Sequence, residues 1–134
     1  MADTFQLEIV TPEKLVVDDR AEEMQIPGKN GYLGVLPGHA PLITELAVGE
    51  ISYRRGGTTE RLAVAWGFAE VLPEKVTILA QTAERGEEVD VARAERARER
   101  AQAFLNSGRS DTDYPRAQAA LERAQARLDV AGKR

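Results

Sequence analysis

Arginine side chains recur at helical spacing in the last third of this chain. Within the segment EEVDVARAERARERAQ (residues 87–102), Arg93, Arg96 and Arg100 fall inside an arc of about 60° if the segment is an α-helix. A planar guanidinium presents paired N–H donors whose geometry matches the oxygens of a phosphate. This spacing therefore predicts a surface that binds an anion.

A second row of arginines follows further along the chain. Arg116, Arg123 and Arg127 fall within an arc of about 40° on a second predicted helix. If the two helices pack antiparallel, both rows lie on the same side of the pair. Six guanidiniums on one flank repel one another unless a multiply charged anion lies between them, which favours a compact polyphosphate as the ligand.

Two other interpretations of the arginines stay open. One is an ordinary solvated surface, in which pairs such as Glu95 with Arg98 or Arg96 with Glu99 contribute about 0.2–0.5 kcal/mol each. The other is nucleic-acid binding, which predicts a steeply salt-dependent affinity for a duplex. The acidic balance of the chain, with a net charge of −4, and the lack of interleaved aromatic residues argue against nucleic acid as a partner.

The composition excludes most other chemistry. The chain has no cysteine, which removes disulfides, thiolate metal ligands and cysteine nucleophiles, and its single histidine is His39. The glycines of GKNGYLG (residues 28–34) match neither the P-loop pattern nor a dinucleotide-binding turn. No apolar run approaches the ~20 residues of a membrane span, and the N-terminus lacks the layout of a signal peptide. We therefore expect a cytoplasmic protein in which most metal and triad chemistry is excluded.

Residues 1–86 carry the sequence features of short strands joined by turns. They hold nine of the eleven glycines and five of the six prolines. A turn is predicted at Gly28–Gly31, the Gly56-Gly57 pair predicts one hairpin, and Pro73-Glu74 is placed at the tip of another. Strand-like runs that recur every 8–12 residues predict an all-β, antiparallel sandwich of about ten short strands.

Residues 87–134 predict an antiparallel two-helix hairpin instead. Asp90 suits the N-cap of a helix that begins at Val91, Gly108 interrupts the helical pattern, and Pro115 suits the first turn of a second helix. Each helix has one stripe of small or apolar residues: Ala94, Ala97, Ala101 and Phe104/Leu105 on the first, and Ala117, Ala120/Leu121, Ala124, Leu128 and Ala131 on the second. Alanine methyls bury little area, so the hairpin is expected to be weakly held, either as a mobile element or as a merely marginal domain.

Several segments of the chain together resemble one known family. IPGKNGYLGVLPGHAPLITEL (residues 26–46), VDVARA (residues 89–94) and ALERAQARL (residues 120–128) closely resemble the ε subunit of bacterial and chloroplast F-type ATP synthases. The resemblance covers essentially the whole chain, and LGVLPGHAPL is highly specific to that subunit. It implies a regulatory subunit with no active site of its own, hence no catalytic residues, no metal site and no required cofactor, in an ATP synthase that moves protons or sodium ions.

The resemblance implies a role for each part of the chain. The sandwich, residues 1–86, would bind the rotating γ subunit and rest on the membrane-embedded ring of c subunits. The hairpin, residues 87–134, would fold against the sandwich or extend along γ to the catalytic β and α subunits, where it inhibits ATP hydrolysis. The implied location is the cytoplasmic face of the bacterial plasma membrane, with the chloroplast thylakoid less favoured and membrane contact made only through the complex.

The resemblance also implies that ATP binds the folded hairpin as a regulatory ligand. The family motif I/L-D-x-x-R-A reads VDVARA here, with a valine as a conservative departure at the first place. The family's ATP contacts carry over to Glu84, Asp90, Arg93, Arg100, Arg123 and Arg127. Glu84 and Asp90 would face the base or ribose, while the arginines would hold the phosphates. A simple N-cap role for Asp90 is compatible with this, and Arg96 and Arg98 are left as surface or inhibitory charges.

A loop around residues 31–39 is the implied contact with the c-ring. Its residues are Gly31, Tyr32, Leu33, Gly34, Pro37, Gly38 and His39. Many relatives have an acidic residue where this chain has Tyr32, so a charge-based contact does not carry over at that position. The alternative to this whole interpretation is an independent β-sandwich interaction module that dimerises through its helices and is indifferent to γ.

Overall fold

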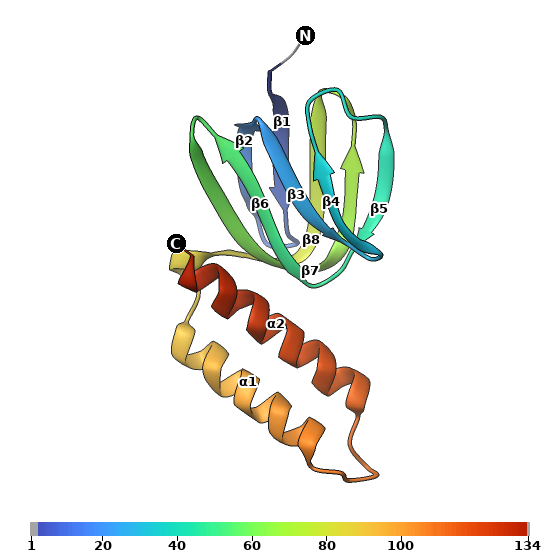
Figure 1. The fold of residues 1–134 in the computed structure, drawn as a ribbon, viewed down its shortest axis with the longest axis vertical. Helices are drawn as coiled ribbons and strands as arrows, with labels where there is room; N and C mark the ends of the chain where they lie inside the picture. The colour runs from blue at the N-terminus through green and yellow to red at the C-terminus, as the bar shows by residue number, and fades with distance from the viewer. Residues whose placement is uncertain (1–2, 134) are drawn as a thin grey trace.

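A computed structural model describes residues 3–133 and shows a β-sandwich followed by a helical hairpin (Figure 1). The predicted fold class is confirmed, although the described residues form eight strands and not about ten. The strands are β1 (Phe5–Val10), β2 (Leu15–Ala21), β3 (Glu23–Gly28), β4 (Gly31–Val35), β5 (Leu42–Leu46), β6 (Gly49–Arg55), β7 (Thr58–Val71) and β8 (Lys75–Arg85). A short 3₁₀ helix, η1 (Gly86–Glu88), leads to α1 (Val91–Asn106) and α2 (Tyr114–Gly132).

The length of β7 accounts for part of the lower strand count. This strand has 14 residues and runs through Trp66-Gly67, where the sequence suggests the boundary between two hairpins. Its first half pairs with β6 as far as Val64 opposite Gly49, and its second half pairs with β5 from Gly67 opposite Leu46. One bent strand is therefore shared by the two layers of the sandwich.

The predicted turns are confirmed. Gly56 and Gly57 have φ angles of 55° and 84° and join β6 to β7, a two-residue turn in which glycine supplies both positive φ angles. At the tip between β7 and β8, the Leu72 N–H donates to the Lys75 carbonyl at 2.8 Å. The turn at residues 28–31 joins β3 to β4.

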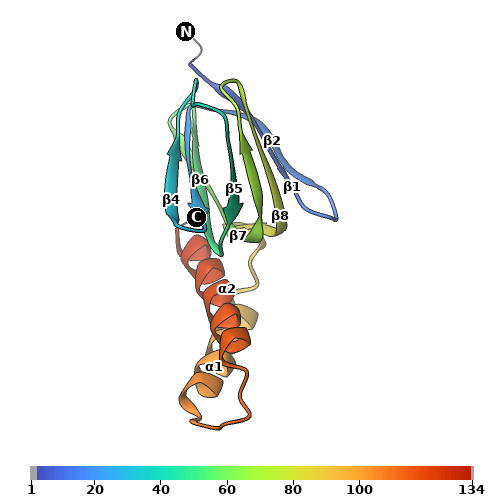
Figure 2. The same ribbon diagram turned by 90° about the vertical axis from the view of Figure 1, so that its right-hand side faces the viewer.

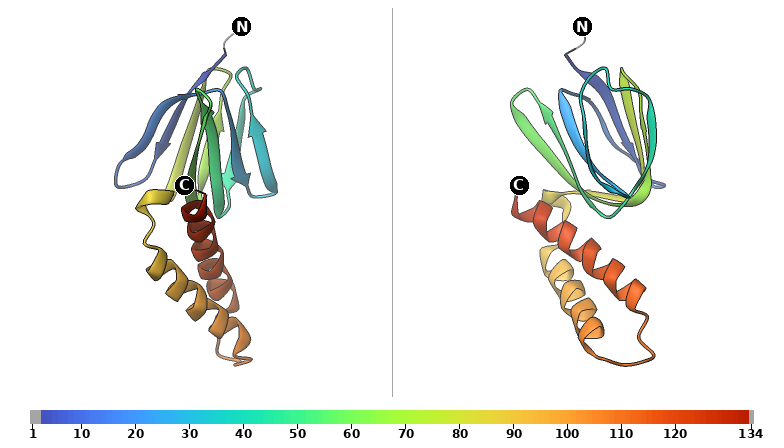
Figure 3. Two further views of the ribbon diagram at one scale, coloured as in Figure 1. Left: turned by 60° about the vertical axis from the view of Figure 1, so that its left-hand side comes forward. Right: turned by 45° about the vertical axis from the view of Figure 1, so that its right-hand side comes forward.

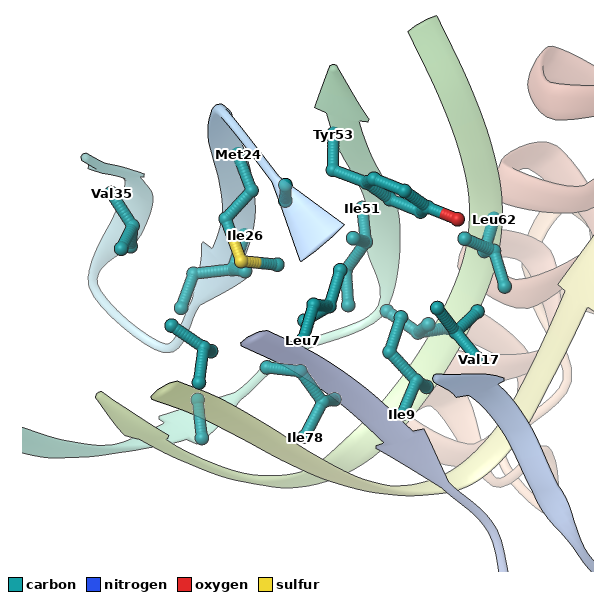
Figure 4. Close-up of a cluster of buried hydrophobic side chains, with 14 of the residues drawn as sticks. Leu7, Ile9, Val17, Met24, Ile26, Val35, Ile51, Tyr53, Leu62 and Ile78 are labelled. Carbon is teal, nitrogen blue, oxygen red and sulfur yellow. The ribbon is translucent and has the colours of Figure 1, made fainter. Parts of the chain in front are cut away.

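Alternate residues of the strands form the core of the sandwich. Phe5, Leu7 and Ile9 of β1 point inward and are at most 1% exposed. Figure 4 shows Ile51 and Tyr53 of β6 lying across from this strand, between the layers. Every member of this buried cluster precedes Gly86, so the sandwich has a hydrophobic core of its own.

Both helices begin at a side-chain cap. Asp90 accepts a hydrogen bond from the Arg93 N–H at 3.1 Å, and Asp113 accepts one from the Arg116 N–H at 3.1 Å. Pro115 lies in the first turn of α2, as predicted. The alanines of the predicted stripes that are buried include Ala94 and Ala101 on α1 and Ala117 and Ala124 on α2. The helices run side by side and antiparallel, with their connecting loop pointing away from the sandwich (Figure 2).

A second face of α2 packs against the sandwich. Ala126 and Val130 are buried with Ala63 of β7, and the half-buried Val48 packs beside them. Figure 3 shows the C-terminal end of α2 lying against one end of the sandwich. In this structure the hairpin is therefore packed against the sandwich through α2. Within residues 3–133, no helix is both long and apolar enough to cross a membrane.

Candidate anion-binding site

The predicted site residues meet where the end of β8 approaches the two helices. Glu84 lies near the end of β8, Asp90 caps α1, Arg93 and Arg100 follow along α1, and Arg127 extends from α2. All five line one cleft of about 630 Å³. This volume lies within the ~300–1,000 Å³ that small-ligand pockets usually occupy. The fold therefore brings residues from three elements to one place.

Arg123, the sixth predicted residue, lines an adjoining cleft of about 580 Å³. The two clefts share Ala97, Arg100 and Arg127, so they lie next to each other along the hairpin. Every arginine of the two predicted rows lines one cleft or the other. Both rows thus lie on the same side of the helix pair, as their spacing predicts.

Some of the predicted residues already have partners within the protein. Arg127 Nε donates to Glu84 Oε1 at 2.6 Å, which joins α2 to the last strand of the sandwich. One oxygen of Asp90 accepts the cap hydrogen bond of α1. Among residues 3–133, no carboxylate lies within ion-pair distance of Arg93 or Arg100. These two guanidiniums have their donors available for an anion.

Arg123 has a partner that the sequence analysis did not identify. Its guanidinium carbon lies 5.0 Å from the centroid of the Trp66 ring, a cation–π distance. Trp66 belongs to β7, so this contact is a further link between α2 and the sandwich. The only signal in the sequence is a lone tryptophan before a glycine, which does not reveal a contact made by tertiary packing.

The segment predicted as a loop around residues 31–39 is a strand in its first half. Gly31–Val35 is β4, which pairs with β3 and places Tyr32 opposite Pro27. The prediction of a loop is wrong for Gly31–Val35, because the turn before Gly31 starts a hairpin that these residues continue. Tyr32 is 61% exposed, and its hydroxyl accepts a hydrogen bond from the Glu50 N–H at 3.0 Å.

The remaining part of that segment is the connection from β4 to β5. The Gly38 N–H donates to the Pro73 carbonyl at 2.8 Å, which holds the connection against the tip of the β7–β8 hairpin. His39 Nδ1 lies 2.7 Å from the Ala40 carbonyl oxygen. The connection lies at the end of the sandwich opposite the helices (Figure 1). A partner that binds this connection would approach the molecule from the side away from the clefts.

A β-sandwich followed by a helical hairpin is the architecture of one class of ATP synthase subunit. The family model for "ATP synthase, Delta/Epsilon chain, beta-sandwich domain" matches residues 4–86, and the model for "ATP synthase, Delta/Epsilon chain, long alpha-helix domain" matches residues 87–132. The two models meet between Gly86 and Glu87, within η1, just after the last strand ends and before the first α-helix begins.

Known relatives narrow the assignment. The ATP synthase epsilon chain of Koribacter versatilis is 72% identical over 107 residues, which cover 80% of this chain and 75% of the relative. That of Bacillus subtilis is 52% identical over 130 residues, or 97% of this chain and 98% of the relative. A chain in the mitochondrial ATP synthase structure of Euglena gracilis superimposes with a TM-score of 0.83 at 25% identity, over 98% of this chain and 82% of that chain.

The chain belongs to the family of bacterial F-type ATP synthase epsilon chains, which are non-catalytic subunits of the central stalk. The family resemblance stated from the sequence is thereby confirmed. The assignment also favours a stalk subunit over an independent module that dimerises through its helices.

Proposed function

We propose that this chain couples the rotor to the c-ring and that its hairpin inhibits ATP hydrolysis unless ATP holds it folded. The observation that carries the proposal is that one cleft is lined by β8, α1 and α2 together. A ligand in this cleft contacts all three elements only when the hairpin is folded. Binding therefore shifts the population toward the folded form.

The residues of the cleft suit ATP as a regulatory ligand. Arg93 and Arg100 offer unpaired guanidiniums for phosphate oxygens, and Arg127 is already fixed by Glu84. Asp90 and Glu84 are the acceptors available for the ribose or base. Arginines outnumber carboxylates in the two clefts together, so the electrostatic attraction favours the binding of a polyanion over that of a neutral ligand.

Loss of ATP would release an arginine-rich helix. Residues 1–86 carry 8 basic and 13 acidic side chains, whereas residues 87–134 carry 10 and 9. The extended hairpin would lie along γ and bring Arg93, Arg96 and Arg98 to acidic surfaces of the catalytic β and α subunits. The sandwich would meanwhile bind γ and rest on the c-ring through β4 and the connection that follows it. The chain would thus be peripheral, on the cytoplasmic face of the bacterial plasma membrane.

Isothermal titration of the full chain with ATP tests the nucleotide site. We expect saturable binding that is lost in the double variant Arg93→Ala with Arg127→Ala. Arg98→Ala is the matched control, because Arg98 lies on α1 but lines neither cleft. An absence of heat with the unmodified chain would remove the nucleotide switch and leave the coupling role standing.

The inhibitory role needs the whole enzyme. ATP hydrolysis is compared between ATP synthase assembled with the full chain and with a chain that ends at residue 86. We expect faster hydrolysis with the shortened chain, and more so at low ATP, where the hairpin is extended. Equal rates under all ATP concentrations would contradict an inhibitory hairpin.

A further inference from the structure

Trp66 combines features that the proposed function does not use. It is the only tryptophan of the chain and is 39% exposed. Among residues 3–133 it is also the only non-glycine residue with a positive φ, at 48°. A bulky side chain in the left-handed region is a conformational outlier, and such outliers are retained where the surrounding structure or the function requires them.

The bend of β7 explains the positive φ but not the tryptophan. The strand changes partner from β6 to β5 between Val64 and Gly67. Gly67 has a φ of 141°, and a Cβ built on it would lie 1.8 Å from the Leu79 carbonyl oxygen, so β8 passes directly against this bend. Glycine or asparagine meets a left-handed requirement with the least strain. The ring of Trp66 therefore needs an explanation of its own.

The contact with Arg123 supplies that explanation. A cation–π contact uses the flat face of the guanidinium and leaves the N–H edges unpaired. A carboxylate partner would instead occupy those donors, as Glu84 does with Arg127 Nε at 2.6 Å. An indole under Arg123 can therefore hold the guanidinium at the cleft without competing with an oxyanion for its hydrogen bonds.

We propose that Trp66 is a positioning residue of the anion site, which holds Arg123 at the cleft and ties α2 to the sandwich. The identity of the anion as ATP rests on the proposed function. The Trp66–Arg123 pair and its effect on the docking of α2 are independent of that function. The proposal can thus be tested with and without a ligand.

The test with ligand uses two substitutions that separate the ring from the backbone strain. Trp66→Asn removes the ring and relaxes the bend, whereas Trp66→Phe keeps an aromatic face in the same backbone. We expect the Kd for ATP, measured by titration calorimetry on the full chain, to rise about two- to fivefold in Trp66→Asn. Trp66→Phe should stay close to the unmodified chain. Urea unfolding of Trp66→Asn is the check that the sandwich remains intact.

The test without ligand is a double-variant cycle read by hydrogen exchange of the α2 amides. Trp66→Asn and Arg123→Gln are each expected to accelerate exchange about two- to fivefold, and the double variant no further, because both remove the same pair. Arg116→Gln, on the same helix and lining the same cleft, is the control and should leave exchange unchanged.

Two results would overturn the proposal. Additive acceleration in the double variant would mean that Trp66 and Arg123 act separately, and equal effects of Trp66→Asn and Trp66→Phe would mean that the aromatic ring is irrelevant. If the unmodified chain binds no ATP, the proposed nucleotide function is wrong, independently of the role of Trp66. The exchange cycle then decides whether Trp66 positions Arg123.

Discussion

Asp19 of β2 connects the first hairpin of the chain to β6. Its Oδ2 accepts hydrogen bonds from Arg55 Nη1 at 2.8 Å and from the Tyr53 hydroxyl at 3.3 Å. Burial raises the pKa of Asp19, but the hydrogen bonds from Arg55 and from the Arg20 N–H outweigh it, so the pKa lies below its ordinary value. Such a carboxyl stabilises the fold above its unfolded-state pKa and ceases to do so as the pH falls through its folded-state pKa.

We therefore expect Asp19→Asn to lower the free energy of unfolding at neutral pH and to lose this effect in acid. Urea unfolding between pH 7 and pH 3 measures the difference from the unmodified chain. That difference should be constant near neutrality and shrink below about pH 4, the ordinary pKa of aspartate. Asp18→Asn is the matched control, because Asp18 is the exposed neighbour on the same strand. A difference that does not change with pH would contradict the role given to the carboxylate.

Gly67 allows the bend of β7 to pass against β8. A Cβ here would lie 1.8 Å from the Leu79 carbonyl oxygen, and any residue at this position has to adopt a φ of 141°, which favours glycine. We expect Gly67→Ala to lower the free energy of unfolding by about 2 kcal/mol or more. Gly34→Ala is the control, because a Cβ at Gly34 of β4 has nothing within 4 Å, and its effect should stay within about 0.5 kcal/mol. If Gly67→Ala and Gly34→Ala change the free energy of unfolding in urea equally, β8 must shift to accommodate the new methyl group at residue 67.

At the scale of elements, the features predictable from sequence are those set by near neighbours. The Gly56-Gly57 turn and the Asp90 cap each depend on a few consecutive residues, so they can be predicted from the types of those residues. The course of β7 through Trp66-Gly67 cannot be predicted in this way, because it depends on pairing with β5 and β6, whose register is set by distant strands. By contrast, β4 pairs with β3 across the local turn at residues 28–31, so this hairpin is predictable from the turn itself.

The candidate site divides in the same way. Helical periodicity predicts that two arginine rows share one side of the hairpin, since the spacing within each helix fixes the rows. The ion pair of Arg127 with Glu84 and the contact of Arg123 with Trp66 depend on how α2 docks on the sandwich. No pattern within the helices encodes that docking, and Glu84 entered the predicted site only through the family resemblance.

The docking of α2 depends on a small apolar contact. Val130 is 1% exposed and packs with Ala126 and Ala63. We expect Val130→Ala to weaken docking by about 1 kcal/mol, which corresponds to about fivefold faster hydrogen exchange of the α2 amides. Gln125→Ala, at an exposed position of the same helix, should change exchange little. If the amides of the sandwich accelerate equally, α2 does not open separately, and the idea of an independently mobile hairpin is wrong.

The molecule as a whole is divided between a part with its own core and a part that depends on its neighbours. The large buried cluster lies within the sandwich, whereas the hairpin contributes small clusters such as Val89 with Ala94 and Ala131. An ion pair adds to the docking: Lys133 Nζ lies 3.2 Å from Glu50 Oε1, where the lysine side chain is 51% exposed and the glutamate side chain 16%. Solvent-exposed pairs contribute about 0–1 kcal/mol each, and because the lysine is half exposed we expect this pair to adjust the docking equilibrium without dominating it.

This division predicts different behaviour for the two halves when they are separated. A chain that ends at residue 86 is expected to unfold cooperatively in urea with a midpoint close to that of the sandwich in the full chain. A peptide of residues 87–134 is expected to show less than half of the helical circular dichroism that its two helices give in the full chain, because short helices with alanine seams lack enough buried area to hold together. Analytical ultracentrifugation is the check that each piece is monomeric under these conditions.

If the hairpin acts as the switch of the proposed function, this outcome decides what kind of switch it is. If the isolated peptide is largely unfolded, release from the sandwich costs helical structure as well as contacts, and the extended form needs a surface on γ or the catalytic subunits to refold on. A ligand in the cleft then opposes both the unfolding of the hairpin and its release from the sandwich. The switch is then more sensitive to ATP than it would be if the ligand affected docking alone. A fully helical peptide would contradict this and reduce the switch to the movement of a rigid hairpin, governed by the contacts of α2 with the sandwich.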